Sequence, residues 1–203
     1  FEYVIIFGLS LYLRQSFFRG MDMSVYACEY NSPLGIITIA CDESAVIGLW
    51  FEGQKYFGST LSEEWEYKYT DALKLAKQWL DIYFEGREPD FMPPLRYDLT
   101  PFRNTVCEIM LKIPYGKTMT YEEIASELAR QKRIAKMSAQ AVGGAVGHNP
   151  ISLMIPCHRV VGTNGNLTGY AGGIDRKVKL LELENVNIEK FFIPNKNLDF
   201  SIR

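Results

Sequence analysis

Three closely spaced prolines, Pro89, Pro93 and Pro94, divide the sequence into two parts with different hydrophobic patterns. Proline lacks a backbone N–H and disfavours helical backbone at the residue before it, so such a cluster favours a linker. Short β-branched and aromatic runs come before the prolines, whereas apolar residues at helical spacing dominate after them. The sequence therefore predicts a strand-containing first part and a mainly helical second part, with the linker ending near Arg96.

The first part shows three strand-like runs, at 24–30, 35–40 and 45–51, with polar turn formers between them. Runs of this length and spacing predict an antiparallel meander. Apolar residues then recur at helical spacing over 73–84, and Gly86 is a suitable end for that helix.

The second part opens with strong helix-start signals. Thr100 can cap a helix whose first residue is Pro101, and Thr120 with Glu123 forms the capping-box pattern of a second helix. A basic link over 130–136 then leads to a third, short helix. Two helices joined by such a link suggest a helix-turn-helix.

The third helix is predicted to start at Ser138 and to end before Asn149, and it contains Gly143 and Gly144. Each interior glycine costs about 1 kcal/mol relative to alanine in a helix. The glycines indicate either tight packing against a neighbouring element or a small surface that lets the backbone approach nucleic acid. Gln140 is the only side chain here of a type suited to base-edge contacts.

Charge is divided unevenly along the chain. Residues 1–96 hold 8 Lys and Arg against 14 Asp and Glu, a net charge of −6, and residues 97–203 hold 14 against 10, a net charge of +4. The division favours a polyanionic partner for the second part, although uneven scatter of surface charge explains it equally well.

The cysteines and the first 22 residues indicate in which compartment the protein is expected to lie. Four widely spaced cysteines fit neither a zinc site nor a disulfide framework, so we expect reduced thiols in a cytoplasmic protein without a metal. Residues 1–22 contain an apolar run too short to span a bilayer and lack signal-peptide features. We expect this segment to lie outside the fold, with a membrane-surface anchor as the alternative.

The segment IPCHRVVG (155–162) closely resembles the O6-alkylguanine-DNA alkyltransferases, also called methylated-DNA–protein-cysteine methyltransferases. It is preceded by AVGGAVGHNPIS (141–152) and followed by LTGYAGG (167–173), and the resemblance extends from about Met23 to Glu184. It implies an α+β fold, with a small ribonuclease H-like α/β domain at 23–96. A mainly helical, winged-helix-like helix-turn-helix domain at 97–190 and a tail at 191–203 would follow.

The resemblance also implies a function. The family repairs DNA directly by flipping an alkylated guanine out of the duplex and moving its O6-alkyl group to a cysteine. This chain is therefore expected to act once per molecule, as a monomer and without a cofactor, on double-stranded DNA carrying O6-alkylguanine. Whether O4-alkylthymine is also a substrate stays open.

Five residues match the family's catalytic positions. Cys157 matches the nucleophile, which must be a thiolate to attack carbon. His158 matches the residue that takes the thiol proton through an ordered water, a relay that also follows if Cys157 and His158 point to opposite sides of an extended chain. Glu184 matches the carboxylate that orients the imidazole, as in Ser-His-Asp systems. Asn149 matches the residue that holds the surrounding turn, and Tyr121 the donor to guanine N3. From the residues alone, Cys157 could instead be a buried space-filler and Tyr121 a core or capping aromatic.

Further positions match the family's binding surfaces. Main-chain groups near Val160 and Ala171 match those that recognise the base, and Tyr170 to Gly173 would form a lid whose Gly172 allows close approach. Gln140 stands where well-known members have an arginine that fills the gap left by the flipped base, which predicts weaker DNA binding or slower repair. The other expected DNA contacts are Ser138, Ala139, Ala141, Gly143 and Arg159.

Three other functions are compatible with parts of the sequence. A sensor that binds alkylated bases without repair is one, but such relatives lack the cysteine of the PCHR segment. A cysteine hydrolase built from Cys157, His158 and Glu184 is the second, and it would need an oxyanion hole. A small transcription regulator using the helix-turn-helix is the third.

Overall fold

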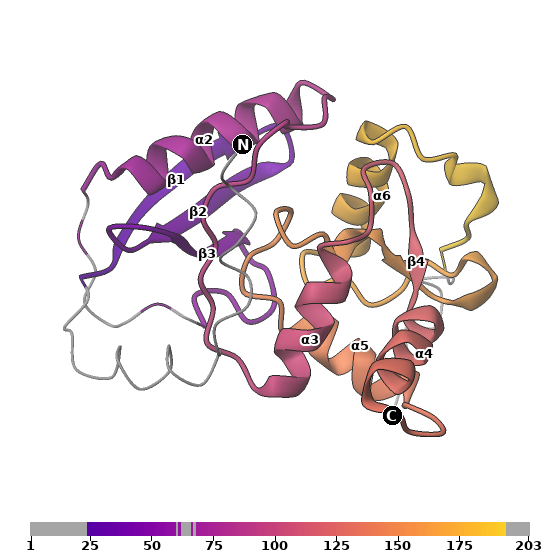
Figure 1. Ribbon diagram of the computed structural model, residues 1–203. Helices are drawn as coiled ribbons and strands as arrows, with labels where there is room; N and C mark the ends of the chain where they lie inside the picture. Colours follow the sequence, from indigo (N-terminus) through magenta and orange to yellow (C-terminus); the bar gives the residue numbers. More distant parts are fainter. Residues whose placement is uncertain (1–23, 60, 62–65, 67, 194–203) are drawn as a thin grey trace, which may run out of the picture.

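The first part of the chain forms a three-stranded sheet covered by one helix (Figure 1). The computed structural model describes residues 24–59, 61, 66 and 68–193. Strands β1 (Tyr26–Ser32), β2 (Gly35–Cys41) and β3 (Val46–Phe51) pair antiparallel in the order β1-β2-β3, which confirms the predicted meander.

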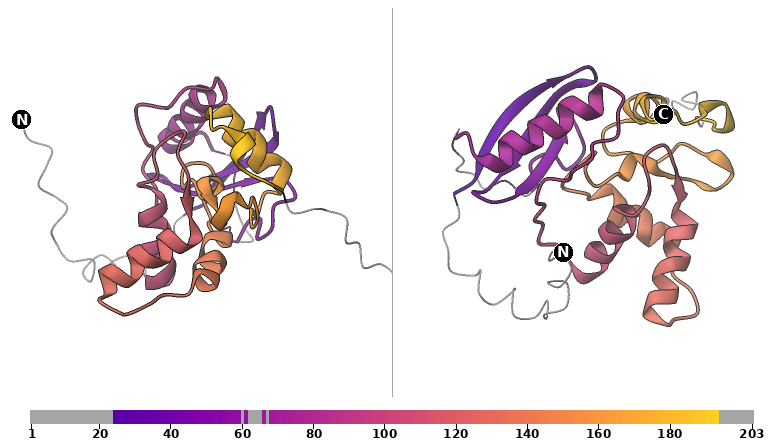
Figure 2. Two further views of the ribbon diagram at one scale, coloured as in Figure 1. Left: turned by 90° about the vertical axis from the view of Figure 1, so that its right-hand side faces the viewer. Right: turned by 45° about the horizontal axis from the view of Figure 1, so that its top comes forward.

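Helix α2 (Asp71–Phe84) lies along one face of this sheet, as the right-hand view of Figure 2 shows. The Thr70 hydroxyl accepts from the Leu73 N–H and begins the helix, and Gly86 follows its end at a φ of 78° that favours glycine. The apolar stripe of α2 packs on the inward side chains of the strands, so the predicted helix is confirmed.

The opposite face of the sheet is closed by a tryptophan lying over small residues. Ala27, Ala40 and Gly48 stand opposite one another on successive strands, and the buried Trp50 ring folds back over Gly48. A Cβ atom on Gly48 would overlap that ring. The small residues therefore make room for Trp50, which is fully buried over them.

Among its described residues, the second part contains four α-helices: α3 (Pro101–Met110), α4 (Tyr121–Lys132), α5 (Ala139–Gly147) and α6 (Ile174–Leu183). Short 3₁₀ turns cover Cys157–Arg159, Thr163–Gly165 and Ile188–Lys190, and β4 (Met119–Thr120) pairs parallel with β5 (Val160–Val161).

The three predicted helix caps of the second part are confirmed. The hydroxyls of Thr100, Thr120 and Ser138 each accept from a backbone N–H of their helix, and Thr120 forms the full capping box with Glu123. The predicted basic link is partly wrong, because α4 continues to Lys132 and only the residues from 133 to 138 connect it to α5. Helices α3, α4 and α5 pack against one another, as a helix-turn-helix requires (Figure 1).

Strand β3 joins the two parts. The Leu49 N–H donates to the Pro150 carbonyl at 2.9 Å, and the Ser152 N–H donates to the Leu49 carbonyl at 2.9 Å. The segment leading to the PCHR residues therefore extends the edge of the first sheet, and a single hydrophobic core runs through both parts. This pairing fixes the PCHR segment against the sheet.

Further predictions from the sequence concern the two ends of the chain and the cysteines. Residues 1–22 and most of the expected tail at 191–203 lie outside the described residues. None of the helices in the described part of the chain is long and apolar enough to cross a membrane. All four cysteines are free and buried, as the expectation of reduced thiols requires.

Replacing Gly48 with alanine should lower the free energy of unfolding by about 1–3 kcal/mol, because the new methyl group must displace the buried Trp50 ring. Urea unfolding followed by tryptophan fluorescence measures the change. Gly144→Ala is the matched control, since a Cβ atom there meets nothing within 4 Å in an α-helix. The control should leave stability unchanged or raise it by up to about 1 kcal/mol. Equal stability of Gly48→Ala and the unmodified protein would contradict this packing account.

Candidate active site

The PCHR residues form a buried turn. Cys157, His158 and Arg159 make one 3₁₀ turn after Pro156, and the Cys157 side chain lies in the core, with the residue 4% exposed. The prediction of an extended chain at Cys157 and His158 is therefore wrong, because this backbone is turned. An extended backbone thus gives no support for a water relay between the two side chains.

Asn149 holds this turn together. Its side-chain N–H groups lie within hydrogen-bond distance of the Cys157 Sγ, at 3.0 Å, and of the Ile155 carbonyl, at 2.8 Å. Its Oδ1 accepts from the Ile151 N–H at 3.0 Å. The amide thus connects the turn after α5 to the cysteine and gives the sulfur a hydrogen-bond donor.

Glu184, the residue that ends α6, lies beside His158 and Arg159. Its Oε1 is 2.7 Å from His158 Nε2, and its Oε2 accepts from Arg159 Nε at 2.8 Å. The carboxylate also accepts from the Gly116 N–H at 3.1 Å and from the Tyr83 hydroxyl at 2.8 Å. The structure therefore brings the expected His158–Glu184 pair together and adds three further donors to the carboxylate.

The pKa directions follow from this arrangement. Burial by itself would raise the pKa of Glu184, but the hydrogen bonds from His158 and Arg159 and the positive charge of Arg159 outweigh it and lower the pKa to about 2. Burial lowers the pKa of His158, against the opposing effect of Glu184. The resting imidazole is accordingly neutral, and its Nε2–H donates a hydrogen bond to the anionic carboxylate of Glu184.

Cys157 is protonated in this resting arrangement. Burial raises the pKa of its thiol, although the Asn149 hydrogen bond and the charge of Lys177 act in the opposite direction. The expectation of a thiolate therefore does not describe this arrangement, and a thiolate at Cys157 would require a base that removes the proton. His158 Nδ1 is buried without a hydrogen-bond partner and is suited to accept it.

The segment expected to form a lid lies beside His158. Tyr170 is buried near His158, with 6.5 Å between the ring centroids, and a Cβ atom on Gly172 would lie 2.7 Å from the Tyr170 ring. The Tyr121 hydroxyl lies 3.2 Å from the carbonyls of Thr168 and Gly169. Tyr121 therefore ties the first turn of α4 to the two residues that precede the expected lid.

The main-chain groups expected to recognise the base already have partners. The Val160 carbonyl accepts from the buried Lys177 ammonium, which also donates to the Thr168 carbonyl at 3.0 Å. Burial lowers the pKa of Lys177 to about 8. The Ala171 carbonyl accepts from the Lys55 N–H of the first part at 3.1 Å.

Arg159 occupies a different place from the one expected. Its guanidinium donates to both carboxylate oxygens of Glu184 and to the Ile113 carbonyl at 2.7 Å, and the residue is 9% exposed. These contacts use the groups that a DNA phosphate would need. The guanidinium therefore lies on the buried carboxylate, and the expected contact of Arg159 with DNA stays a prediction.

The exposed side of α5 is small. Ser138, Gln140 and Ala141 are exposed there, while Ala139 is half-buried. Gly143 is half-buried, with the Tyr121 ring 3.9 Å from where its Cβ atom would lie, and an added Cβ atom on the exposed Gly144 meets nothing within 4 Å. Packing therefore does not explain Gly144, and the open face fits the alternative of close approach by a partner.

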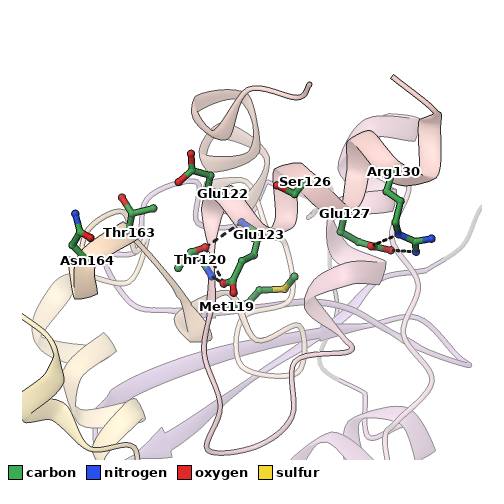
Figure 3. Close-up of a pocket in the computed structure, with 9 residues that line it drawn as sticks. All are labelled: Met119, Thr120, Glu122, Glu123, Ser126, Glu127, Arg130, Thr163 and Asn164. Carbon is green, nitrogen blue, oxygen red and sulfur yellow. Dashed lines mark hydrogen bonds and ion pairs between the residues drawn. The ribbon is translucent and has the colours of Figure 1, made fainter. Parts of the chain in front are cut away.

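A surface hollow of about 580 Å³ lies elsewhere, along α4 and Thr163–Asn164 (Figure 3). Two of its carboxylates already have partners: Glu123 bonds Thr120 in the capping box, and Glu127 bonds Arg130. The hollow does not include Cys157 or His158, so it is separate from the chemistry of the PCHR turn. In the described part of the chain, no group of His, Cys, Asp and Glu side chains could hold a metal ion.

Sequence reasoning missed Tyr83, Gly116 and Lys177. A signal existed for two of them, because Tyr83 continues the apolar stripe of α2 and Lys177 stands at helical spacing between apolar residues of α6. A charged residue on an apolar face indicates a buried partner. Gly116 contributes its backbone N–H, for which a side-chain pattern gives no signal.

Family models match most of the chain. Residues 25–97 match the 6-O-methylguanine DNA methyltransferase, ribonuclease-like domain, and residues 101–186 match the DNA binding domain of the same family.

Individual proteins similar to this chain belong to the same family as the matching models. A methylated-DNA–protein-cysteine methyltransferase of Saccharolobus islandicus is 41% identical over 170 residues, covering 82% of this chain and 99% of the relative. One from Mycobacterium bovis is 42% identical over 154 residues, covering 76% and 88%. The crystal structure of the Mycobacterium tuberculosis O6-methylguanine methyltransferase is similar with a TM-score of 0.67 and 41% identity, over 79% of this chain and 92% of that one. A DNA complex of the M. tuberculosis protein matches at 38% identity with the same TM-score, over 82% and 94%.

Replacing Arg159 with methionine should lower the free energy of unfolding by about 3–5 kcal/mol near neutral pH, because Glu184 would lose its charged partner. The folded pKa of Glu184 is lowered, so its contribution is present above the unfolded value of about 4.3 and is lost as the pH falls toward 2. Denaturation at pH 7 and at acidic pH should therefore show a stability difference that shrinks with acid. Unchanged stability with weakened DNA binding would instead support a DNA contact.

Proposed function

The chain belongs to the 6-O-methylguanine DNA methyltransferase family and repairs DNA by alkyl transfer, and we propose that Cys157 is the residue that accepts the alkyl group. The observation that carries this proposal is the placement of Cys157 in the described structure. Its sulfur accepts from Asn149 within the turn that also holds His158 against Glu184. The cysteine therefore shares a rigid turn with a base whose orientation is fixed.

His158 acts as the base. Its Nε2–H is held by Glu184, which leaves the lone pair of Nδ1 free to take the thiol proton of Cys157 through a bridging water. The sulfur then attacks the alkyl carbon, the bond from that carbon to O6 breaks, and a thioether forms. The electron pair of the broken bond stays on the guanine, which is protonated as it leaves. The thioether has no easy leaving group, so each molecule acts once.

Tyr121 assists the leaving guanine. Burial raises the pKa of its hydroxyl to about 12, so the hydroxyl is protonated and can donate toward guanine N3. It donates to the Thr168 and Gly169 carbonyls at rest, and an entering base would replace them as its acceptor. Movement of Tyr170 to Gly172 would admit the base, and the main chain at Val160 and Ala171 would contact its edges.

The partner we propose is double-stranded DNA carrying O6-alkylguanine, bound by a single protein molecule along α5. Ser138, Ala139, Ala141 and Gly143 would contact the backbone, and the small surface at Gly144 would allow the helix to sit deep in a groove. Gln140 would occupy the gap left by the flipped base. O4-alkylthymine remains a second candidate substrate, and the free cysteines support a cytoplasmic location.

The three alternative functions have less support. A sensor does not need a cysteine held by Asn149 next to a neutral histidine, and this chain has both. A hydrolase and a transcription regulator do not account for the match of residues 25–97 and 101–186 to methyltransferase domains.

Incubation with an oligonucleotide containing O6-methylguanine should add one methyl group to the intact protein, and peptide mapping should place it on Cys157. Cys157→Ser should gain none. Cys107→Ser is the matched control, because it removes another buried thiol and should leave the methyl transfer intact. A methyl group on a different residue, or none on the unmodified protein, would refute the assignment of Cys157.

Gln140→Arg should tighten binding to duplex DNA by about tenfold, equivalent to about 1.4 kcal/mol, because it adds a cation on the exposed side of α5. The slope of log affinity against log salt should steepen by about one. Fluorescence anisotropy at several salt concentrations measures both. Gln78→Arg adds the same charge to exposed α2 and should change neither. If the two variants bind alike, Gln140 does not face the DNA.

A further inference from the structure

The first part of the chain contributes one side chain to the reacting centre of the second. Tyr83 lies in α2 and is fully buried, yet its hydroxyl is 2.8 Å from Glu184 Oε1 and 3.3 Å from His158 Nε2. These partners are 101 and 75 residues away in sequence. The contact is therefore a tertiary link between the helix over the sheet and the His158–Glu184 pair.

We propose that Tyr83 is a positioning residue that sets the orientation and the proton affinity of His158 through Glu184. The proposal rests on the role of His158 as the base, and it gives the ribonuclease-like part of the chain a direct effect on alkyl transfer.

The direction of the hydrogen bond follows from the neutral state of His158. The Nε2–H of His158 donates a hydrogen bond to Glu184, and this nitrogen therefore cannot accept one from Tyr83. The Tyr83 hydroxyl donates to Glu184 Oε1 instead. Burial, followed by the charge of Glu184, holds the pKa of Tyr83 well above its usual value, which keeps this donor protonated. The phenol and the imidazole therefore share one acceptor oxygen.

Sharing that oxygen weakens its pull on the imidazole. A hydroxyl donating to Oε1 disperses the negative charge of the carboxylate and reduces its ability to stabilise a protonated His158. With the hydroxyl in place, His158 loses its proton more readily and stays available as a base at lower pH. Without it, Glu184 would hold the imidazolium more strongly.

Packing fixes the phenol in this position. The Tyr83 ring stacks on Trp79 with 5.2 Å between centroids, and the edges of Phe84 and Tyr115 meet it at 5.4 and 6.2 Å. A phenylalanine would fill the same space and make the same ring contacts. The comparison of Tyr83 with phenylalanine therefore isolates the hydroxyl from the packing of the ring.

The test is the pH dependence of single-turnover methyl transfer from an O6-methylguanine oligonucleotide. In Tyr83→Phe, the acid limb of the curve of rate against pH should move to higher pH by about 0.5–1 unit. The rate at pH 6 should fall severalfold, while the rate at pH 8 should stay within about twofold. Tyr30→Phe is the matched control, because it also removes a tyrosine hydroxyl bonded to a carboxylate, that of Asp81 on α2. Its acid limb should not move.

Each outcome decides the proposal. A folded Tyr83→Phe with an unmoved acid limb would overturn it and leave Tyr83 a packing residue. If Tyr83→Phe does not fold, 3-fluorotyrosine at position 83 replaces it: a more acidic hydroxyl donates more strongly and should move the acid limb to lower pH, and no shift again refutes the proposal. If the unmodified protein transfers methyl but shows no acid limb, the base role of His158 fails, and this proposal fails with it.

Discussion

The buried carboxylate of Glu184 is the interaction on which the arrangement of the site depends. An isolated carboxylate in a protein interior is strongly unfavourable, so its position requires several donors at once. Tyr83 comes from the helix over the sheet, Gly116 from the loop after α3, and His158 and Arg159 from the PCHR turn. Because these segments meet at one charge, the relative position of the two parts and the orientation of the base are fixed together. The pairing of β3 with residues 150–152 holds the same turn from the other side.

The resting site keeps its reactive groups neutral. Burial favours the protonated thiol of Cys157 and the unprotonated imidazole of His158. In the mechanism we propose, any alkylating or oxidising agent that reaches a thiolate of Cys157 would consume the protein, so a buried and protonated sulfur is protected until a substrate enters. The hydrogen bonds from Tyr121 to the Thr168 and Gly169 carbonyls and from Lys177 to the Val160 carbonyl hold the residues around Cys157 in this arrangement.

The sequence predicted best what depends on neighbouring residues. The three strands, α2 and the caps at Thr100, Thr120 and Ser138 follow from local spacing and side-chain chemistry, and all are present. The pairing of His158 with Glu184 followed only from a resemblance to a family. The burial of Arg159 was not predicted, because a basic residue in the sequence gives no local indication of a buried partner. The apolar stripe of α2 indicates that Tyr83 is buried, but its contact with Glu184 was missed because the two residues lie 101 positions apart. Contacts of this kind depend on the tertiary fold and leave no periodic pattern in the chain.

The most direct test of this account is the protonation state of His158, observed by NMR of ¹⁵N-labelled imidazole in the DNA-free protein. The other histidine, His148, can be removed as His148→Gln to make the assignment unambiguous. At pH 7 we predict a neutral ring with the proton on Nε2, bonded to Glu184, and a pKa below the ordinary value of about 6.5. A charged imidazolium at pH 7, or a neutral ring with its proton on Nδ1, would contradict the account, because neither form could take the proton of Cys157.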